Sequence, residues 1–387
     1  MIHEARKHLI NDIIPFWKGL RDDEQGGYYG LVDFDGNVDK KAEKGCILHS
    51  RILWFFSNAY LVLKDKSLLS EADHAYRFIT EYCIDREYGG IYWSMNYDGT
   101  VADSTKHTYN QAFCIYALSS YYDATGNRDA IKLAGQLQQI VEKKCTDEVG
   151  YLEAFNRDFT PADNDKLSEN GVIAEKTMNT LLHVMEGYTE YYRVTKDKYT
   201  EEKLKMILDT LFNKIYNSKL HRQEVFFDKD FNTLIDLHSY GHDIETSWLA
   251  ERSSDILADP VYMAKMRGVS KDLADTIYKR AYKNHSLLNE CEKGVDDTWR
   301  IWWVQAEAVL GFYNAYIRET DHKEYLEAAE DIFGFIQDKM VNPNLREWYW
   351  RVDEKGNPDK EKPIVEPWKC PYHNGRMCIE IIKNAEA

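Results

Sequence analysis

The stretch Gly26-Gly27-Tyr28-Tyr29, followed by Asp35-Gly36, decides the fold that we expect for this chain. It returns 63 residues further on as Gly89-Gly90-Ile91-Tyr92, followed by Asp98-Gly99. A motif that recurs at such an interval is typical of an architecture built from repeated units. The 387-residue chain is therefore expected to contain similar units arranged one after another.

Weaker copies of the motif occur at Gly150-Tyr151-Leu152 and Trp348-Tyr349-Trp350. Each copy is short and aromatic and ends in a turn signal, so we expect small hairpins between longer segments. In those segments apolar residues recur every three to four positions, which indicates helices. The more apolar helices are expected to begin near Ser50, Tyr109, Lys176, His242, Arg300 and His373. The more polar helices are expected over residues 72–82, 129–144, 201–215 and 325–339.

Each unit thus combines a helix that is apolar on most faces with an amphipathic helix. The first kind must be buried and the second can face water, which predicts two concentric layers of six helices each. We therefore predict an all-α fold, an (α/α)6 barrel with short β-hairpins in its connecting loops. An open solenoid would also repeat helix pairs, but its apolar ends would need caps. No Pro/Gly/Ser-rich linker interrupts the pattern, so residues 1–387 are predicted to form a single catalytic domain.

Composition argues against several classes of partner. The chain carries 49 basic and 65 acidic side chains, and a net charge of -16 repels nucleic acid and anionic lipid. No apolar run approaches the roughly 18 residues of a membrane span, and the N-terminus lacks an apolar signal segment. Seven scattered cysteines without CxxC spacing suggest buried, reduced thiols. We expect a cytoplasmic monomer without a nucleic-acid or membrane partner.

Chemically distinctive residues stand near the expected starts of the apolar helices. If those helices begin at one end of the barrel, their first turns converge on a common mouth. The residues at these starts are Arg51, Tyr109, Asn110, Asn179, His183, His242, Glu245, Trp303, Glu307, His373 and Arg376. The sequence thus predicts a pocket lined by imidazole, carboxylate, guanidinium and indole groups.

Two of these starts carry a spacing that favours function. His242 and Glu245 share one helical face at i and i+3, and Trp248 lies one step further round it. Trp303 and Glu307 at i and i+4 lie one above the other, so the indole could stack on a sugar ring while the carboxylate tunes a histidine. The structural alternatives are a helix-capping histidine and a core tryptophan beside a solvated glutamate.

Two further segments point to the same pocket. Asn179 and His183 share a face inside the apolar run 178–185, where a histidine needs a polar partner. Residues 367–376 combine two prolines, two aromatic residues and His373 before the last helix, and a rigid loop of this kind can aim a side chain. The alternative is a barrel-closing loop with an Asn-Gly turn. No HExxH, His-Cys or phosphate-loop spacing is present, so neither a metal nor another cofactor is predicted.

Histidines titrate near neutral pH, with an ordinary pKa of about 6.5, so two of them can exchange protons with a substrate. Epimerisation of a sugar at C2 needs a proton removed beside the aldehyde and one returned from the opposite face of a planar enediolate. We assign this pair as His242 and His373. Arg51 is the predicted cation for the enediolate oxygens.

The remaining groups receive supporting roles. Glu245 and Glu307 are predicted to orient the acid/base histidines, and His183 to hydrogen-bond the oxygens of the substrate. Trp303 and Trp368 are predicted to form stacking walls for the sugar.

Across nearly its whole length the chain resembles the N-acylglucosamine 2-epimerase superfamily and, within it, the cellobiose 2-epimerases. The matching stretches are residues 49–56, 106–113, 168–171, 239–245, 300–307 and 368–376. This resemblance implies an (α/α)6 barrel that converts the reducing-end glucose of cellobiose or lactose reversibly to mannose, by ring opening and proton transfer. It implies no metal and no nucleotide.

The resemblance also assigns residues, and no departure is visible at these motifs. It implies that the essential arginine is Arg51, the histidines are His183, His242 and His373, and the carboxylates are Glu245 and Glu307. The implied aromatic clamp is Tyr109, Trp303 and Trp368, and we add Asn179 and Trp248 to the predicted substrate-binding set.

Three other functions remain open. An aldose-ketose isomerase of the mannose isomerase type would use the same residue types but return the proton to C1. An inverting glycoside hydrolase would use Glu245 and Glu307 as two carboxylates roughly 6.5 to 9.5 Å apart. A sugar-binding module would hold the substrate without changing it.

Overall fold

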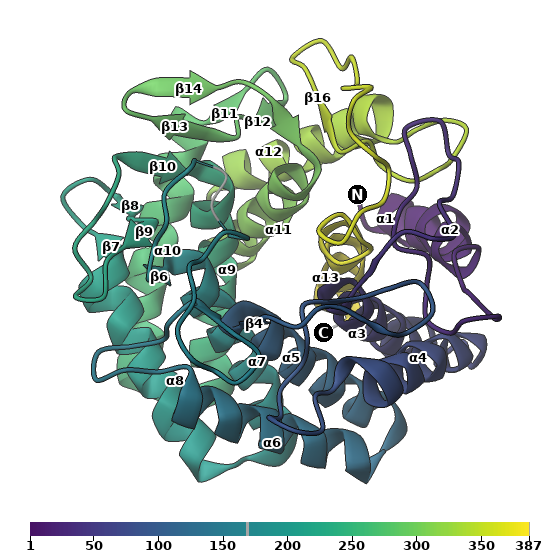
Figure 1. Cartoon of the computed structure of the whole chain (residues 1–387). Helices are drawn as coiled ribbons and strands as arrows, with labels where there is room; N and C mark the ends of the chain where they lie inside the picture. Colours follow the sequence, from purple (N-terminus) through teal and green to yellow (C-terminus); the bar gives the residue numbers. More distant parts are fainter. Residues whose placement is uncertain (168–169, 387) are drawn as a thin grey trace.

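The computed structural model describes residues 1–167 and 170–386, and six of its helices form a closed inner ring (Figure 1). Consecutive ring helices pack side by side, and the last packs against the first. These helices are α3 (Cys46–Leu63), α5 (Thr108–Thr125), α7 (Met178–Thr195), α9 (Tyr240–Leu257), α11 (Trp302–Arg318) and α13 (His373–Glu386). The predicted (α/α)6 barrel is therefore confirmed. The helices form a closed ring and not an open solenoid.

An outer layer of helices covers this ring. It consists of α1 (Ile2–His8) with η1 (Leu9–Ile13) and α2 (Ile14–Lys18), α4 (Ser67–Phe78), α6 (Arg128–Lys144), α8 (Lys198–Thr210), α10 (Pro260–Arg280) and α12 (Lys323–Phe335). Three of these helices continue into a π-helical turn, η2 (Ile79–Cys83), η3 (Leu211–Ile215) or η4 (Ile336–Met340).

Burial separates the two layers as the apolar patterns predicted. Every residue from 108 to 121 in α5 is buried, because α5 has neighbours on all sides. In α6 only Ala130, Ala134, Leu137, Gln138 and Val141 are buried, which is a single stripe at helical spacing.

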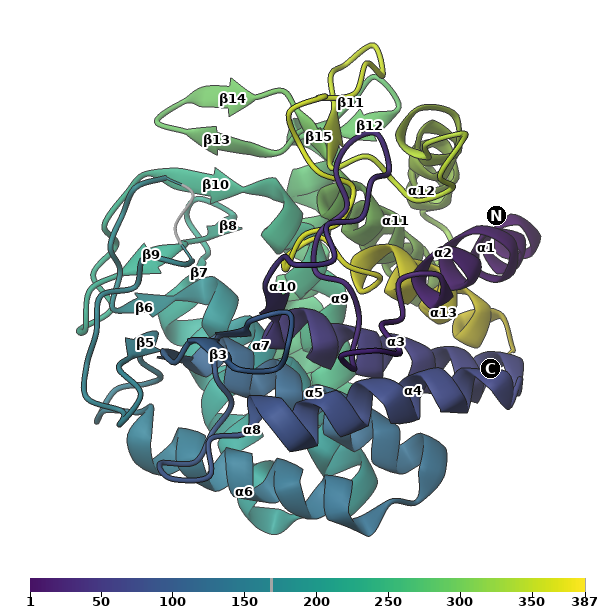
Figure 2. The ribbon, with the colours of Figure 1, turned by 45° about the vertical axis from the view of Figure 1, so that its right-hand side comes forward.

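Short antiparallel strands connect each unit of the ring to the next. The strand before an inner helix pairs with a strand from the following unit: β1 (Lys44–Gly45) with β2 (Ser94–Met95), β4 (Lys106–His107) with β5 (Ala154–Phe155), β6 (Lys176–Thr177) with β9 (Phe226–Phe227), β10 (Leu237–Ser239) with β13 (Glu290–Glu292), and β15 (Arg300–Ile301) with β16 (Arg351–Val352). Further pairs are β2 with β3 (Val101–Asp103), β13 with β14 (Val295–Asp297), β7 (Tyr216–Asn217) with β8 (Arg222–Gln223), and β11 (Tyr282–Lys283) with β12 (Ser286–Leu287). Figure 2 shows the strands gathered at one side of the barrel.

The ring closes through one more strand-like contact, between the first and last units. Val32 forms a bridge with Val365, and each backbone N–H donates to the carbonyl of the other residue at 3.1 Å. This bridge joins loops that are more than 300 residues apart in the chain.

The glycine motif that revealed the repeat has a definite structural purpose. Gly26 and Gly89 adopt left-handed φ angles of 79°, which tightens each turn. The carbonyls of these two glycines accept hydrogen bonds from the buried ammonium groups of Lys44 and Lys106, at 2.7 and 3.1 Å. Each lysine also pairs with an aspartate at the start of the turn. The motif therefore ties a hairpin to the strand that precedes an inner helix.

One expectation about the core needs correction. Helix α3 has 18 residues and a mean hydropathy of 1.3, so by length and composition it could span a membrane, although no such run was expected. In the structure 78% of this window is buried inside the barrel, so α3 is a core helix. The seven cysteines are free and buried, as expected.

Candidate active site

A cavity of about 520 Å³ opens at the end of the barrel where the inner helices begin. Its volume lies within the range that is usual for small-molecule sites. Nine of the eleven predicted site residues line it: Arg51, Tyr109, Asn179, His183, His242, Glu245, Trp303, Trp368 and His373. The convergence of helix starts on one mouth is therefore observed.

His373 begins α13 and is held from behind by a carboxylate. Its Nδ1 lies 2.8 Å from Oε1 of Glu307, which is completely buried on α11. A carboxylate accepts the Nδ1 proton, so the neutral ring keeps its Nε2 lone pair free for the cavity. Burial, with Arg376 and Arg51 nearby, lowers the pKa of His373 well below 6.5. His373 is thus a neutral imidazole whose orientation is set by Glu307.

His242 has a different partner from the one expected. Its Nδ1 shares a hydrogen bond of 2.7 Å with Oγ of Ser239, the last residue of β10, whereas Glu245 bonds to Arg376. The predicted orientation of His242 by Glu245 is therefore wrong, because the Glu245 carboxylate pairs with the Arg376 guanidinium and Ser239 takes its place at Nδ1. Burial and the nearby His183 lower the pKa of His242 to about 3.

Trp303 contacts both of these histidines. Its ring centroid is 4.7 Å from that of His242 and 5.6 Å from that of His373. The two imidazoles therefore contact one common indole and share one cavity. Gly241 makes room for this indole, since a Cβ there would lie 2.5 Å from the ring. Gly241 has no left-handed φ, so close packing against the indole explains the glycine.

His183 is the third imidazole of the cavity, and it also has a carboxylate behind it. Its Nδ1 lies 2.9 Å from Oε2 of Glu186, and this oxygen accepts from the hydroxyl of Tyr372 at 2.5 Å. Burial lowers the pKa of His183, although Glu186 opposes this. Burial alone would raise the pKa of Glu186, but Arg376 and His183 outweigh it and hold the value at about 2.

Arg51 presents a positive charge that is not neutralised by an acid. One guanidinium nitrogen donates to Tyr109 Oη at 2.7 Å and the other to the carbonyl of Trp368 at 3.1 Å. Its guanidinium also stacks on Phe113 at 4.3 Å. Within the part of the chain that the structure describes, no carboxylate forms an ion pair with Arg51. The group is therefore available to stabilise a negative charge that develops in the cavity.

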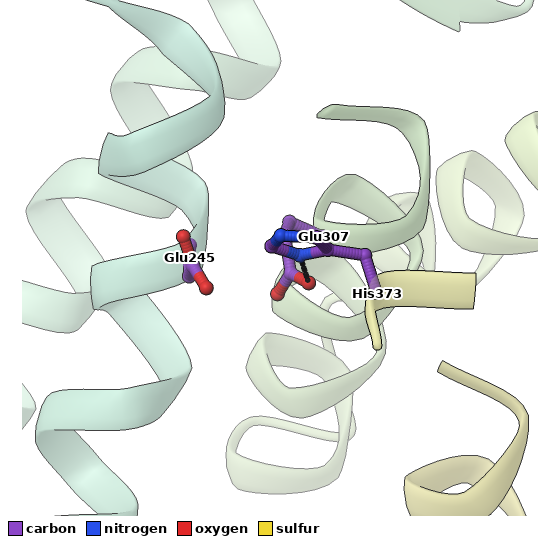
Figure 3. Close-up of side chains that lie close together, drawn as sticks. All are labelled: Glu245, Glu307 and His373. Atoms are coloured by element: carbon purple, nitrogen blue, oxygen red, sulfur yellow. Dashed lines mark hydrogen bonds and ion pairs between the residues drawn. The ribbon is translucent and has the colours of Figure 1, made fainter. Parts of the chain in front are cut away.

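Glu245, Glu307 and His373 form a compact cluster (Figure 3). One donor atom from each lies within 4.8 Å of the others, which is a spacing that could hold a metal ion. Nη2 of Arg376 donates to both carboxylates, at 2.7 Å in the case of Glu307, so a cation could enter only if this guanidinium moved. Burial and the neighbouring Glu307 raise the pKa of Glu245 to about 8.

Two predicted residues lie one layer behind the described lining of the cavity. Trp248 was expected to bind substrate, but it is buried, and its Nε1 donates to Oε2 of Glu307 at 3.0 Å. Its place in the substrate-binding set is therefore not supported, and it acts as a support for Glu307. Glu307 itself touches His373, Trp248 and Arg376, as suits an orienting group.

An aromatic wall forms the side of the cavity near Arg51. Trp368 lies 5.8 Å from Tyr109 and 5.4 Å from Trp93, as measured between ring centroids. Tyr109 meets His183 edge-on at 4.9 Å. Flat apolar faces of this kind suit the C–H face of a sugar ring.

Sequence reasoning missed Ser239, Glu186 and Tyr372 and left Arg376 without a role. A signal existed for two of them, because Glu186 follows His183 at i+3 and Arg376 follows His373 at i+3. Ser239 gave no comparable signal, since a serine before a helix is usually a cap. Of the stretch 168–171, residues 168 and 169 lie outside the described residues.

The geometry disfavours an inverting hydrolase. The donor atoms of Glu245 and Glu307 lie within 4.8 Å, whereas such enzymes place their carboxyl groups about 6.5 to 9.5 Å apart. Both groups also share the Arg376 guanidinium, and Glu307 does not reach the cavity.

Fold and cavity together define an (α/α)6-barrel protein with three histidines in one cavity. The sequence model of the N-acylglucosamine 2-epimerase (GlcNAc 2-epimerase) family matches residues 26–374. A cellobiose 2-epimerase of Eubacterium cellulosolvens is 51% identical, with 98% of this chain and 97% of the relative covered. The crystal structure of a sugar epimerase from a ruminal bacterium has a TM-score of 0.98 at 46% identity, and 99% of each chain is covered. A D-mannose isomerase of Marinomonas mediterranea is only 23% identical, over 93% of this chain and 92% of its own length.

The chain belongs to the N-acylglucosamine 2-epimerase family and is an isomerase of the epimerase class.

Proposed function

We propose that the protein epimerises the reducing-end glucose of β-1,4-linked disaccharides reversibly at C2. Cellobiose would give 4-O-β-D-glucosyl-D-mannose, and lactose would give epilactose. The observation that supports this most is the pair of imidazoles that both contact Trp303, in one cavity with an arginine that forms no ion pair with a described carboxylate. Similarity to a cellobiose 2-epimerase at 51% identity supports the substrate class.

In this mechanism the sugar first opens to its aldehyde. His373 removes the C2 proton through Nε2, since Glu307 at Nδ1 increases its basicity. The electron pair of the broken C–H bond forms an enediolate, whose negative oxygen is stabilised by Arg51 and by a hydrogen bond from Tyr109, while Nε2 of His183 accepts a hydrogen bond from a substrate hydroxyl.

His242, protonated from the solvent, then gives a proton to C2 from the opposite face. Its low pKa makes the protonated ring a strong acid, and its neutral partner Ser239 does not oppose proton release. His373 returns its proton to the solvent, and the aldehyde closes to the epimer. In the reverse direction the two histidines exchange roles, so the reaction needs no other reagent.

The decisive experiment is incubation of the purified protein with cellobiose and a chelator in heavy water. We expect glucosyl-mannose with deuterium at C2. Glucosyl-fructose as the main product would identify an aldose-ketose isomerase instead, and free glucose would identify a hydrolase. Unchanged cellobiose with measurable binding would indicate a sugar-binding module.

His242→Ala and His373→Ala should each lower turnover by about 10²–10⁴-fold or more while the protein stays folded.

We also propose that residues 1–387 act as one catalytic domain, that no cofactor takes part, and that the enzyme works as a monomer in the cytoplasm. Retention of turnover in the chelator supports the second point. Sedimentation of the active protein tests the oligomeric state.

A further inference from the structure

Arg376 occupies the centre of a cluster of charges below the cavity. Its side chain is completely buried on α13. Nη1 donates to Glu186 and to the hydroxyl of Tyr372, and Nη2 donates to Glu245 and to Glu307. The three carboxylates come from three different inner helices, α7, α9 and α11. One guanidinium therefore connects four of the six helices of the inner ring.

Two of these carboxylates lead directly to histidines of the cavity. Glu186 accepts from Nδ1 of His183 at 2.9 Å, and Glu307 accepts from Nδ1 of His373 at 2.8 Å. Arg376 thus connects the two histidines through a chain of hydrogen bonds that runs from His183 to Glu186, to Arg376, to Glu307 and to His373. Arg376 forms ion pairs with both of these carboxylates, Glu186 and Glu307.

Arg376 does not belong to the described lining of the cavity, and neither do Glu186 and Glu307. It cannot act by touching the substrate from this position. Any effect on the reaction must pass through the carboxylates that it holds.

We propose that Arg376 is a positioning residue that holds the Nδ1 sides of His183 and His373 in one shared charge cluster. Because both carboxylates are anchored to the same guanidinium, each imidazole keeps its Nδ1 proton and turns Nε2 toward the cavity. A change at either carboxylate then alters the tautomer and orientation of both imidazole rings. This inference rests on the proposed roles of the two histidines.

An arginine is required here for a geometric reason. Its planar group offers several N–H donors at fixed angles, so it can bridge three carboxylates at once, whereas an ammonium group is a point charge. A buried charge cluster also depends on complete pairing, since an uncompensated carboxylate in the core is strongly unfavourable. Arg376→Lys keeps the charge but removes the bridging geometry.

The test compares Arg376→Lys with the unchanged protein on cellobiose. We expect kcat to fall about 10- to 100-fold, as is usual when the support of a reactive group is removed, with little change in KM. Selective ¹⁵N labelling of histidine should show His183 and His373 in the Nδ1–H tautomer in the unchanged protein. In Arg376→Lys we expect both rings to lose this single form.

Glu186→Gln provides a second and independent test, which is useful if Arg376→Lys folds poorly. Glu186 forms no hydrogen bond with His373 in the described chain, although its charge acts on that ring, and the proposal expects the ¹⁵N signals of His373 to lose the single Nδ1–H form through Arg376. Unchanged His373 signals in Glu186→Gln, or unchanged tautomers and kcat in Arg376→Lys, would overturn the proposal. A rise in KM with constant kcat would also overturn it, since that result indicates direct binding of substrate.

Arg252→Lys is the matched control. Arg252 on α9 donates a hydrogen bond of 2.7 Å to Glu190, and neither residue belongs to the described lining of the cavity. It should lower stability without changing kcat or the histidine signals. The tautomer measurement needs no turnover, so it also separates the two proposals. If cellobiose gave no epimer while the signals changed as expected, the proposed function would fail and the role of Arg376 would stand.

Discussion

The three cavity histidines differ most in what lies behind them. Nδ1 of His373 faces the carboxylate of Glu307, Nδ1 of His183 faces that of Glu186, and Nδ1 of His242 faces only the hydroxyl of Ser239. A carboxylate increases the basicity of an imidazole, whereas a hydroxyl does not. The difference supports the proposed roles of His373 as the base and His242 as the acid.

Glu307→Gln should lower kcat by on the order of 10²–10⁴, because an amide can stabilise the wrong tautomer of His373. KM should change little, since Glu307 does not line the cavity. Steady-state kinetics on cellobiose check this. The control is Glu190→Gln. Glu190 is a buried carboxylate on the inner helix α7 that pairs with Arg193 and Arg252, so its replacement should leave kcat unchanged. A Glu307→Gln enzyme with normal kcat would contradict the orienting role.

Stability should fall as the pH is lowered from 6.5 toward 3. The folded protein keeps His242 neutral, with its pKa lowered to about 3, whereas the unfolded chain takes up a proton near 6.5. Acid therefore favours the unfolded state, by on the order of 1 kcal/mol per pH unit in this interval. Urea unfolding of the native protein and of His242→Gln, measured between pH 7.5 and 4.5, should show a smaller loss in the variant. Equal losses would contradict burial of a neutral ring, and His3→Gln at an exposed position is the control.

At the scale of elements, the positions of the helices were predictable because burial imposes a period on the sequence. The starts near Tyr109 and His373 agree with α5 and α13. The pairing of strands between units was not predictable, since strands of two residues such as β4 contain no period to detect. Glu186 was missed for a related reason, because it lies on the buried helix α7 and its partner Arg376 comes from the other end of the chain.

The contact between α9 and α11 should be sensitive to a single methyl group. In Gly241→Ala the added Cβ would lie 2.5 Å from the Trp303 ring and 2.7 Å from Val304, so the indole that contacts both histidines must shift. We expect a loss of roughly 1–3 kcal/mol in unfolding free energy, as for other overpacked cores, together with reduced kcat. Urea unfolding and kinetics measure both.

Gly268→Ala is the matched control for that variant. Gly268 lies in α10, and a Cβ there would have no atom within 4 Å. Because alanine is the better helix former, this change should stabilise the protein by roughly 0.5–1 kcal/mol without altering kcat. If Gly241→Ala behaved in the same way, close packing at Trp303 would not be the reason for the glycine.

At the scale of the whole molecule, the barrel depends on ring closure more than on the position of the chain ends. Helix α1 packs against α13, and Val32 bridges Val365. The repeat predicted six units, but it could not predict which residues would form the seam, because the first and last units have no neighbouring copy in the sequence. The seam is a result of tertiary structure.

A circular permutant should therefore fold and keep its activity. Joining the natural ends by a flexible linker and opening the chain between Gly126 and Asn127, in the α5–α6 loop, leaves every strand pair intact. We expect kcat close to that of the natural order, measured on cellobiose. Opening between Gly45 and Cys46 instead separates β1 from α3 next to Arg51, and this permutant should lose activity. Equal behaviour of the two would contradict the importance of the strand pairs.

The order of the units along the chain also affects biosynthesis. His373 and Arg376 lie on the last inner helix, α13, and their partners Glu186, Glu245 and Glu307 belong to helices made earlier. During translation these three acids are synthesised well before the guanidinium that balances them. A nascent chain that stops before α13 thus has an open ring and lacks both His373 and Arg376. The barrel can close only after the whole of α13 has been made.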